Sequence, residues 1–335
     1  MIRRLGYACI NMSIGGKCDL KSPCEGCLRC NSPTEAAFKR AKVFTNRSCI
    51  LRTARSFETP DERNAYFGEL LLANARDLLE ILRWNEANGI RLFRLSSEIA
   101  PFMTHSDVGY SLDDLDPSVS EALAECGLFV ATHGHRLSSH PGPFNVLASA
   151  DPRVVDNTIR ELDAQAALFD AIGLPCDHNA KINIHVGGAY GDPDSALDRW
   201  CTNFERLSES ARARLTVEND DRANLYSTRD LYDHVYLRTG VPIVFDYHHH
   251  QFCTGGDTEA EALALAVSTW PEGIVPTVHY SESREIHEGN GDPTPAHSFL
   301  INNIPDTHGH TLDVMVEAKG KELAILPFHT PGVTG

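Results

Sequence analysis

The stretch that decides the fold runs from Val241-Pro242-Ile243-Val244-Phe245 directly into Asp246-Tyr247-His248-His249-His250. Its apolar first half predicts a short, buried β-strand. Burying a polar group without a partner costs roughly 2–7 kcal/mol, so a carboxylate and three imidazoles at the end of such a strand need compensation. A divalent metal ion is the simplest common partner for them. The stretch therefore predicts a buried metal site at the end of a strand.

Strand-like runs alternate with helical patterns along the chain of 335 residues. This alternation, without a linker rich in Pro or Ser, predicts one α/β domain over residues 1–335, folded as a single parallel (β/α)8 TIM barrel. The predicted strands are Arg3–Ile10, Arg91–Ser96, Leu128–His133, Lys181–Val186, Arg214–Glu218, Pro242–Asp246, Ile274–His279 and Thr311–Glu317. The predicted helices are Phe67–Asn88, Pro152–Ile172, Pro193–Arg212, Ser227–Thr239 and Thr258–Trp270, with weaker patterns at Pro117–Glu125 and near His297–Asn303.

Histidine or carboxylate residues stand at or just after the ends of seven consecutive predicted strands. In TIM barrels the chemistry takes place at this end, among the βα loops. One buried histidine is more often a hydrogen-bonded core residue than a ligand, but a series on consecutive strands favours a metal cluster. The residues are His105, His133, His135, His140, His185, Glu218, Asp246, His248, His249, His279 and Glu317.

A mixture of imidazole and carboxylate ligands suits Mn²⁺ or Zn²⁺ better than Ca²⁺ or Cu⁺. About nine such ligands would hold two or three ions. Closely spaced metal ions serve the cleavage of phosphate esters, and they also serve hydride shifts within sugars, as in barrels of the xylose isomerase type. The number of ligands does not separate these two reactions.

The charge distribution favours a phosphate-containing substrate. The net charge of −16 argues against nucleic acid as a partner, yet residues 1–57 hold eleven Lys and Arg against three Asp and Glu, a net of +8. Six basic residues and no acidic one lie between Ala36 and Phe57, Arg47 among them. Such a segment predicts contacts with DNA phosphates; the alternative is a solvated basic surface loop.

Four of the ten cysteines, Cys18, Cys24, Cys27 and Cys30, lie within thirteen residues. Their spacing is typical of thiolate ligands in zinc or iron–sulfur sites, so a second metal site is one interpretation. A loop with reduced, unliganded cysteines is the other.

The N-terminus lacks the apolar segment of a signal peptide, and no apolar run is long enough to span a bilayer. We therefore expect a soluble, cytoplasmic protein without membrane contact. Residues 328–335 are expected to form a flexible tail.

Short motifs follow one another in a fixed order along nearly the whole chain. They are Arg4-Leu5-Gly6-Tyr7 with Asn11, Thr45-Asn46-Arg47, Arg94-Leu95-Ser96-Ser97, Leu137-Ser138-Ser139-His140-Pro141-Gly142, Asn183-Ile184-His185-Val186-Gly187-Gly188, Glu218-Asn219-Asp220-Asp221, Phe245-Asp246-Tyr247-His248-His249-His250 and Val316-Glu317-Ala318-Lys319. Together, and in this order, they resemble the UV damage endonuclease (UVDE) family, a TIM-barrel relative of endonuclease IV. The resemblance implies an ATP-independent DNA-repair endonuclease that nicks immediately 5′ of cyclobutane pyrimidine dimers and 6-4 photoproducts and, in many members, abasic sites.

The resemblance also implies a cluster of two to three divalent ions, typically Mn²⁺, with Zn²⁺, Co²⁺ or Mg²⁺ as alternatives. It implies attack by a metal-activated hydroxide, in line with the leaving 3′ oxygen. Glu218, His249, Glu317 and Lys319 are the implied catalytic residues, and Lys319 is either a group that balances phosphate charge or a surface lysine. The implied metal ligands are His105, His140, His185, Glu218, Asp246, His249, His279, His297 and Glu317.

By the same resemblance, four residues contact the lesion in duplex DNA. Tyr7 and Asn11 lie in the first βα region, where the alternative for Tyr7 is ordinary barrel packing. Pro143 and Phe144 form a second pair; the family usually has Gln at the first of these positions, and Pro143 cannot donate a side-chain hydrogen bond. The expected partner is UV-damaged double-stranded DNA, and the expected state is a monomer.

Two departures from the family are visible in the sequence. Thr277 stands where the family often has a chemically modified lysine near the metals. Residues 16–44, which carry the four clustered cysteines, form an expected insertion in the first βα loop. Two alternatives to the endonuclease remain: a metal-dependent sugar isomerase or epimerase, and a non-catalytic damage-binding protein.

Overall fold

The structure is a computed structural model that describes residues 1–14, 46–289 and 291–329. Eight strands form one sheet in the order β6-β5-β4-β3-β2-β1-β8-β7, and all recorded pairings are parallel. A parallel bridge between Asp246 and His279 joins the two outermost strands. This arrangement confirms the predicted (β/α)8 barrel. The strands are β1 (Ile2–Ala8), β2 (Leu92–Leu95), β3 (Arg136–Ser139), β4 (Ile182–His185), β5 (Leu215–Glu218), β6 (Ile243–Val244), β7 (Thr277–Tyr280) and β8 (Leu312–Val316).

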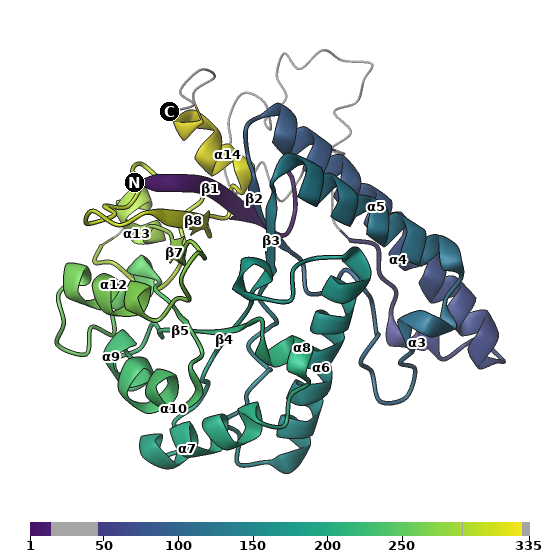
Figure 1. Cartoon of the computed structure of the whole chain (residues 1–335), viewed down its shortest axis with the longest axis horizontal. Helices are drawn as coiled ribbons and strands as arrows, with labels where there is room; N and C mark the ends of the chain where they lie inside the picture. The colour runs from purple at the N-terminus through teal and green to yellow at the C-terminus, as the bar shows by residue number, and fades with distance from the viewer. Residues whose placement is uncertain (15–45, 290, 330–335) are drawn as a thin grey trace.

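Helices surround the sheet on its outside (Figure 1). The long ones begin at side-chain caps, Thr59 for α4 and Asp151 for α6, and each has Pro at its start. No helix of the described chain is both long and apolar enough to cross a lipid bilayer. The helices are α3 (Leu51–Ala54), α4 (Pro60–Ala87), α5 (Pro117–His133), α6 (Pro152–Ile172), α7 (Pro193–Phe204), α8 (Glu209–Arg212), α9 (Thr228–Leu231), α10 (Leu237–Thr239), α11 (Tyr247–His250), α12 (Glu259–Ser268), α13 (Arg284–Glu288) and α14 (Glu322–Ile325), with short turns η1 (Leu112–Asp114), η2 (His178–Ala180), η3 (Tyr232–Tyr236) and η4 (Leu326–Phe328).

The two faces of the strands differ in chemistry. In β4, Ile182 and Ile184 join the main apolar core, which the outer face of the sheet forms with the helices. The alternate residues point into the barrel, as period-2 geometry requires, and there Asn183 donates a hydrogen bond to Glu218 of the next strand. The apolar cluster inside the barrel is small and consists of Ala8, Leu92 and Met315. Most of the barrel interior is therefore polar.

A buried ion-pair group closes the N-terminal end of the barrel. Oδ2 of Asp313 lies 2.9 Å from Nη1 of Arg4 and 2.9 Å from Nη1 of Arg136. Arg136 also donates to the carbonyl oxygens of His178 and Val275. These contacts lie at the opposite end of the barrel from the strand ends that carry Glu218 and His279.

The prediction of a strand at Leu128–His133 is wrong, because these residues form the last turns of α5. That helix ends at Gly134, which adopts the left-handed conformation with φ 66°. The third strand is β3, whose Arg136 and two serines carry little β-propensity. Consequently His133 and His135 lie at the N-terminal side of β3, away from the predicted metal site.

Three further predicted segments are the helix near residues 297–303, the insertion at residues 16–44 and the C-terminal tail. The weak helix near His297–Asn303 is wrong, because this segment forms a bridge from His297 to Ser283 and then turns. The predicted insertion at residues 16–44, with Cys18, Cys24, Cys27 and Cys30, lies outside the described residues. Within the predicted tail, Phe328 belongs to η4 and Nε2 of His329 lies 3.2 Å from the carbonyl oxygen of Leu5.

Glu86, near the end of α4, contacts residues that lie just before β2 and β3. Its carboxylate accepts two hydrogen bonds from Arg91, at 2.6 and 2.9 Å, and lies 2.9 Å from Nε2 of His135. The Arg91 hydrogen bonds have the largest effect on the Glu86 carboxyl and, with His135, lower its pKa to about 2 against the opposing effect of burial. Ionised Glu86 therefore stabilises the fold above its ordinary pKa of 4.5.

We expect Glu86→Gln to lower the free energy of unfolding at pH 7. The difference from wild type should shrink below pH 4.5 and vanish as the pH approaches 2. Urea unfolding at pH 7, 5 and 3.5 measures it. Glu80→Gln is the matched control on the same helix, because the ion pair of Glu80 with Arg83 is exposed, and such pairs contribute little. An equal loss in both variants, or one independent of pH, would contradict the prediction.

Candidate metal centre

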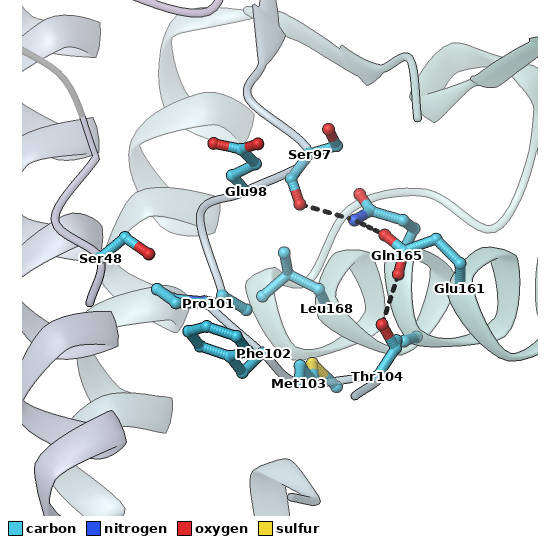
Figure 2. A pocket seen from close by; sticks show the side chains of 12 residues that line it. Ser48, Ser97, Glu98, Pro101, Phe102, Met103, Thr104, Glu161, Gln165 and Leu168 are labelled. Atoms are coloured by element: carbon cyan, nitrogen blue, oxygen red, sulfur yellow. Dashed lines mark hydrogen bonds between the residues drawn. The ribbon is translucent and has the colours of Figure 1, made fainter. Parts of the chain in front are cut away.

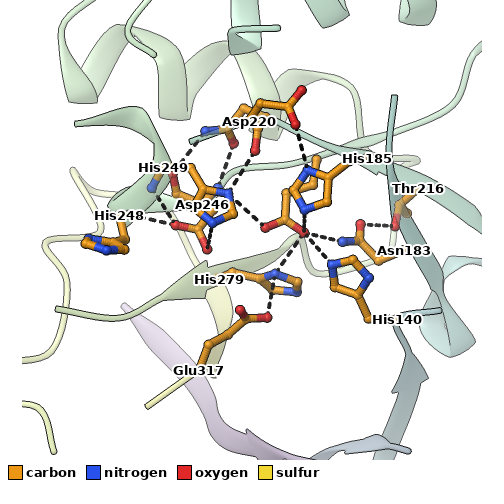
Figure 3. Close-up of polar contacts among 12 residues, drawn as sticks. His140, Asn183, His185, Thr216, Asp220, Asp246, His248, His249, His279 and Glu317 are labelled. Carbon is orange, nitrogen blue, oxygen red and sulfur yellow. Dashed lines mark hydrogen bonds and ion pairs between the residues drawn. The ribbon is translucent and has the colours of Figure 1, made fainter. Parts of the chain in front are cut away.

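Histidines and carboxylates meet at the C-terminal end of the barrel (Figure 3), and several of the histidines lie within ion-pair distance of Glu218. Oε2 of Glu218 lies 3.2 Å from Nε2 of His140 and 3.1 Å from Nδ1 of His279. The same oxygen lies 3.9 Å from Nε2 of His185, while Oε1 lies 3.4 Å from Nδ1 of His249. Four strand ends and their loops thus direct imidazoles to one fully buried carboxylate.

The convergent side chains form three overlapping groups, in each of which the ligand atoms lie within 4.8 Å of one another. Glu218 belongs to two groups and His279 to two, so these residues occupy positions that a cluster of ions would share. The groups are His140, Glu218 and His279; His185, Glu218 and His249; and Asp246, His279 and Glu317.

Several buried polar atoms at this site make no hydrogen bond of normal geometry among the described residues, and for some of them the nearest polar neighbour is another candidate ligand at ion-pair distance. Buried nitrogen and oxygen atoms are normally satisfied, and an unsatisfied one is costly. Their number fits a site whose remaining partners are metal ions. The atoms are Oε1 of Glu218, Oδ2 of Asp246, both ring nitrogens of His248, and Nδ1 of His185, His279 and His297.

The surrounding charges keep two of the carboxylates ionised. Burial raises the pKa of Glu218, but the charges of His279 and His185 and the hydrogen bond with His140 outweigh it, holding that pKa well below its ordinary range. For Glu317, burial is likewise outweighed, chiefly by the Arg94 guanidinium, and its pKa is also held low. Deprotonated carboxylates are the form that binds a metal ion.

The Asp246-Tyr247-His248-His249-His250 stretch combines a cap with ligands. Oδ1 of Asp246 accepts the backbone N–H groups of His248, at 2.7 Å, and His249, at 2.9 Å, and so begins the single turn α11. The side-chain amide of Asn219 pairs with both backbone groups of Asp246, at 2.8 and 3.1 Å. Because the cap uses only Oδ1, Oδ2 of Asp246 is left for a ligand role.

The other histidines of the stretch have different surroundings. The ring of His248 lies 5.5 Å from that of His297, centre to centre, beside the three groups. The ring of His250 lies 5.2 Å from that of Phe245, which belongs to the core. His248 and His297 therefore border the site, and His250 packs behind it.

Several side chains to which no role was assigned from the sequence hold the candidate ligands in place. Arg94 forms an ion pair with Glu317, and Asn183 donates to Glu218. Nζ of Lys181 lies 3.2 Å from Nε2 of His279, and Nδ1 of His185 lies 3.4 Å from Oδ1 of Asp220. A signal was available for Lys181 and Asn183, because they share the inward face of one strand with His185.

The structure does not bring His105 into these groups. Nδ1 of His105 accepts the backbone N–H of Asp107 at 3.1 Å and faces that of Val108 at 3.4 Å. Lys319 lies half-buried beyond β8, and its backbone N–H donates to the carbonyl oxygen of Ser298.

A cavity of about 280 Å³ lies between α6 and the loop after β2, and none of its lining residues belongs to the three ligand groups (Figure 2). Gln165 donates to the carbonyl oxygen of Ser97 and to Glu161, and Thr104 donates to Glu161 at 2.6 Å. Because these polar groups satisfy one another, the cavity does not resemble the ligand-rich centre around Glu218.

The residues expected to contact a lesion fall into two classes. Tyr7 and Asn11 are fully buried; the Tyr7 hydroxyl donates to Asn85 and accepts from Asn11, both at 2.8 Å. Pro143 and Phe144 are exposed, Phe144 to 88%. Direct contact by the first pair would require the barrel wall to open, whereas the second pair is accessible.

Arg47, expected at the DNA surface, is anchored to α4. Its guanidinium pairs with Asp77, and the side chain of Asn74 pairs with both of its backbone groups. About half of the Arg47 side chain remains exposed.

Comparison with known proteins identifies relatives over almost the whole chain. A profile of the family described as UV-endonuclease UvdE matches residues 3–330. The chain is 35% identical to a UV-damage endonuclease of Neurospora crassa, over 98% of the chain and 52% of that protein, and 31% identical to one of Schizosaccharomyces pombe, over 96% and 49%. It thus spans about half the length of these two relatives. A UV DNA damage endonuclease of Bacillus thuringiensis is 32% identical, over 82% of the chain and 86% of that protein.

A solved structure agrees with this result. The crystal structure of SacUVDE superposes with a TM-score of 0.75 at 29% identity and covers 97% of this chain and 96% of its own. The barrel, the cluster of potential ligands around Glu218 and these relatives lead to one conclusion: the chain belongs to the UV-endonuclease UvdE family.

Proposed function

We propose that this chain is a metal-dependent DNA-repair endonuclease that nicks the strand immediately 5′ of UV lesions and acts on abasic sites. The observation that carries the proposal is the set of three overlapping ligand groups that share Glu218 and His279. Such sharing is suited to several closely spaced ions, and the mixed imidazole and carboxylate ligands favour Mn²⁺. Membership of a family whose relatives bear the name UV-damage endonuclease supports DNA as the substrate.

Divalent ions bound here would supply Lewis-acid stabilisation of phosphate charge and a water of lowered pKa. The chain's own residues hold the ligands in place. Asn183 fixes Glu218, and Arg94 fixes Glu317. We assign Lys319, on the segment that leaves β8, to balancing the charge of the substrate phosphate.

The damaged strand would contact two neighbouring loops at the open end of the barrel. Phe144 lies in the loop after β3, and Tyr190, which is 53% exposed, lies in the loop after β4. Tyr190 has φ 52°, a conformation that few residues other than glycine adopt. The Arg199 guanidinium lies 5.6 Å from its ring centre and donates to the carbonyl oxygen of Ala148 in the neighbouring loop. The ring is thus held in place while half exposed, which suits stacking on an unpaired base.

We expect Phe144→Ala and Tyr190→Ala each to weaken binding to a dimer-containing duplex by about 5- to 100-fold, the range that corresponds to the loss of one base-stacking contact. Fluorescence anisotropy with labelled duplex measures the affinity, and elemental analysis should find unchanged metal content. Leu128→Ala is the control, because Leu128 is exposed to 69% on α5. Wild-type affinity in both aromatic variants would remove these loops from the proposed interface.

The function is tested by incubating the protein and Mn²⁺ with a duplex labelled at one end and carrying one pyrimidine dimer. A nick directly 5′ of the dimer, absent from the undamaged duplex and abolished by chelation, is the expected result. Duplex that is bound but intact would instead indicate a damage-binding protein. If the protein neither binds nor nicks the duplex, the proposal is overturned, and the sugar isomerase becomes the leading candidate.

A further inference from the structure

Lys181 is a fully buried lysine inside the barrel. It immediately precedes β4 and shares the inward face of that strand with Asn183 and His185, while Ile182 and Ile184 face the apolar core. Lysine is almost never fully buried unless it is paired. Among the described residues, however, no carboxylate forms an ion pair with its side-chain nitrogen, and Glu218 and Glu317 act on it only through longer-range charge. A buried lysine without such a pair needs another explanation.

The hydrogen-bond partner of Lys181 is an imidazole of the metal centre. Its Nζ lies 3.2 Å from Nε2 of His279, a residue of β7 that is distant in sequence. The second nitrogen of the same ring, Nδ1, lies 3.1 Å from Glu218 and 3.2 Å from Glu317. The two sides of the His279 ring thus have separate partners. A metal ion bound at Nδ1 would leave the ring proton on Nε2, so the Nε2–H group would donate to the Lys181 amine, which accepts only in its neutral form.

His279 is also one of the two side chains shared between ligand groups, so its orientation affects two of the three groups at once. A ring bound through one nitrogen is oriented by what its other nitrogen contacts, and loss of such a contact weakens metal binding by about 10- to 100-fold. We propose that Lys181 is a positioning residue that sets the metal affinity of the centre by fixing the His279 ring. This inference rests on the metal-dependent function proposed above.

The neighbouring Thr277 provides a matched comparison. It lies on β7 two residues before His279, it is buried to the same degree as the strand around it, and its hydroxyl has no hydrogen-bond partner among the described residues. Thr277 therefore lies close to His279 on the same strand, but its hydroxyl does not hydrogen-bond to the His279 ring. If mere proximity mattered, both residues would affect metal binding.

The test measures Mn²⁺ affinity by isothermal titration calorimetry on the full chain, not nicking. Lys181→Met, which keeps the length of the side chain but removes the amine, should weaken Mn²⁺ binding by about 10- to 100-fold. Its metal-free melting temperature should be unchanged or higher, because an apolar group replaces a buried polar one. Thr277→Val should bind Mn²⁺ as wild type does. In a His279→Ala background, Lys181→Met should cause no further loss.

The outcomes separate the inference from the function on which it rests. If the wild-type protein binds no Mn²⁺, the proposed metal-dependent function fails. If the wild type binds Mn²⁺ and Lys181→Met binds it equally well, or if the loss persists in the His279→Ala background, the positioning role is overturned. Lys181→Leu is a second apolar replacement judged by the same criteria. If neither apolar variant folds, Lys181 is a structural residue, and the proposal is overturned as well.

Discussion

Glu218→Gln is expected to lower the rate of nicking at a pyrimidine dimer by about 10³-fold or more. Glu218 is the carboxylate toward which His140, His185, His249 and His279 all point, and glutamine keeps its shape while removing its charge. Ions at such a centre contribute several kcal/mol to stabilising the reacting phosphate, and about 1.4 kcal/mol corresponds to a factor of ten. Single-turnover cleavage of the labelled duplex at saturating Mn²⁺ measures the loss.

Asp221→Asn is the control for this variant, because Asp221 is a partly exposed carboxylate three residues along the same segment, paired at 3.8 Å with Arg222. It should retain wild-type nicking. The circular dichroism spectrum of metal-free Glu218→Gln should match the wild type, while its melting temperature at neutral pH should fall, because the lowered pKa of Glu218 means that its ionised form stabilises the fold. Full activity of Glu218→Gln would remove this residue from the catalytic centre, and an unfolded variant would show that its role is structural.

Gly127→Ala should lower the free energy of unfolding by about 3 kcal/mol or more, the upper part of the range for overpacking. Gly127 lies in α5, where a Cβ atom would be 1.6 Å from the carbonyl oxygen of Ile172 at the end of α6. Helix propensity alone would favour alanine by about 1 kcal/mol. The predicted loss of stability therefore comes entirely from the clash of the new Cβ atom with the Ile172 carbonyl oxygen. Urea unfolding monitored by tryptophan fluorescence measures the change.

Gly68→Ala is the matched control. Gly68 lies in α4, also inside a helix, but a Cβ atom there would have its nearest neighbour 3.8 Å away, an ordinary contact with Val119. The same substitution should therefore stabilise the protein by up to about 1 kcal/mol. Equal effects of both substitutions would show that the α5–α6 contact adjusts easily, contrary to the prediction.

Much of the fold and of the metal centre can be predicted from the sequence because one strand carries both signals. In β4, the apolar residues Ile182 and Ile184 mark the strand, and His185 at its end marks the site. Glu218, at the end of β5, follows the same rule, as does Asp246 just beyond β6. Parallel strands in a barrel place these ends together, so the sequence predicts which side chains meet without predicting their distances.

The sequence predicts less where this signal is weak or absent. The strand β3 contains Arg136 and Ser138 on its inward face, so its composition resembles a loop, while the apolar end of α5 resembles a strand. His105 comes after a strand, but the loop folds its ring nitrogen onto its own backbone. The conformation of Tyr190 depends on contacts from another loop, through Arg199, and no local pattern encodes such contacts.

The polar barrel interior has a consequence for how this protein can vary. Folding energy comes mainly from the apolar layer between the sheet and the helices. The inward residues include the buried ion pairs of Asp313 at one end and the candidate ligands around Glu218 at the other. Radially, the molecule is thus divided into an outer apolar ring and an inner polar column. Substitutions at the Glu218 end are expected to retune which ion the candidate site holds and how tightly, whereas the pairs at the Asp313 end must be kept, because breaking a buried ion pair costs about 3–5 kcal/mol. The Glu218 end is therefore the part of the barrel to alter when the candidate site is redesigned.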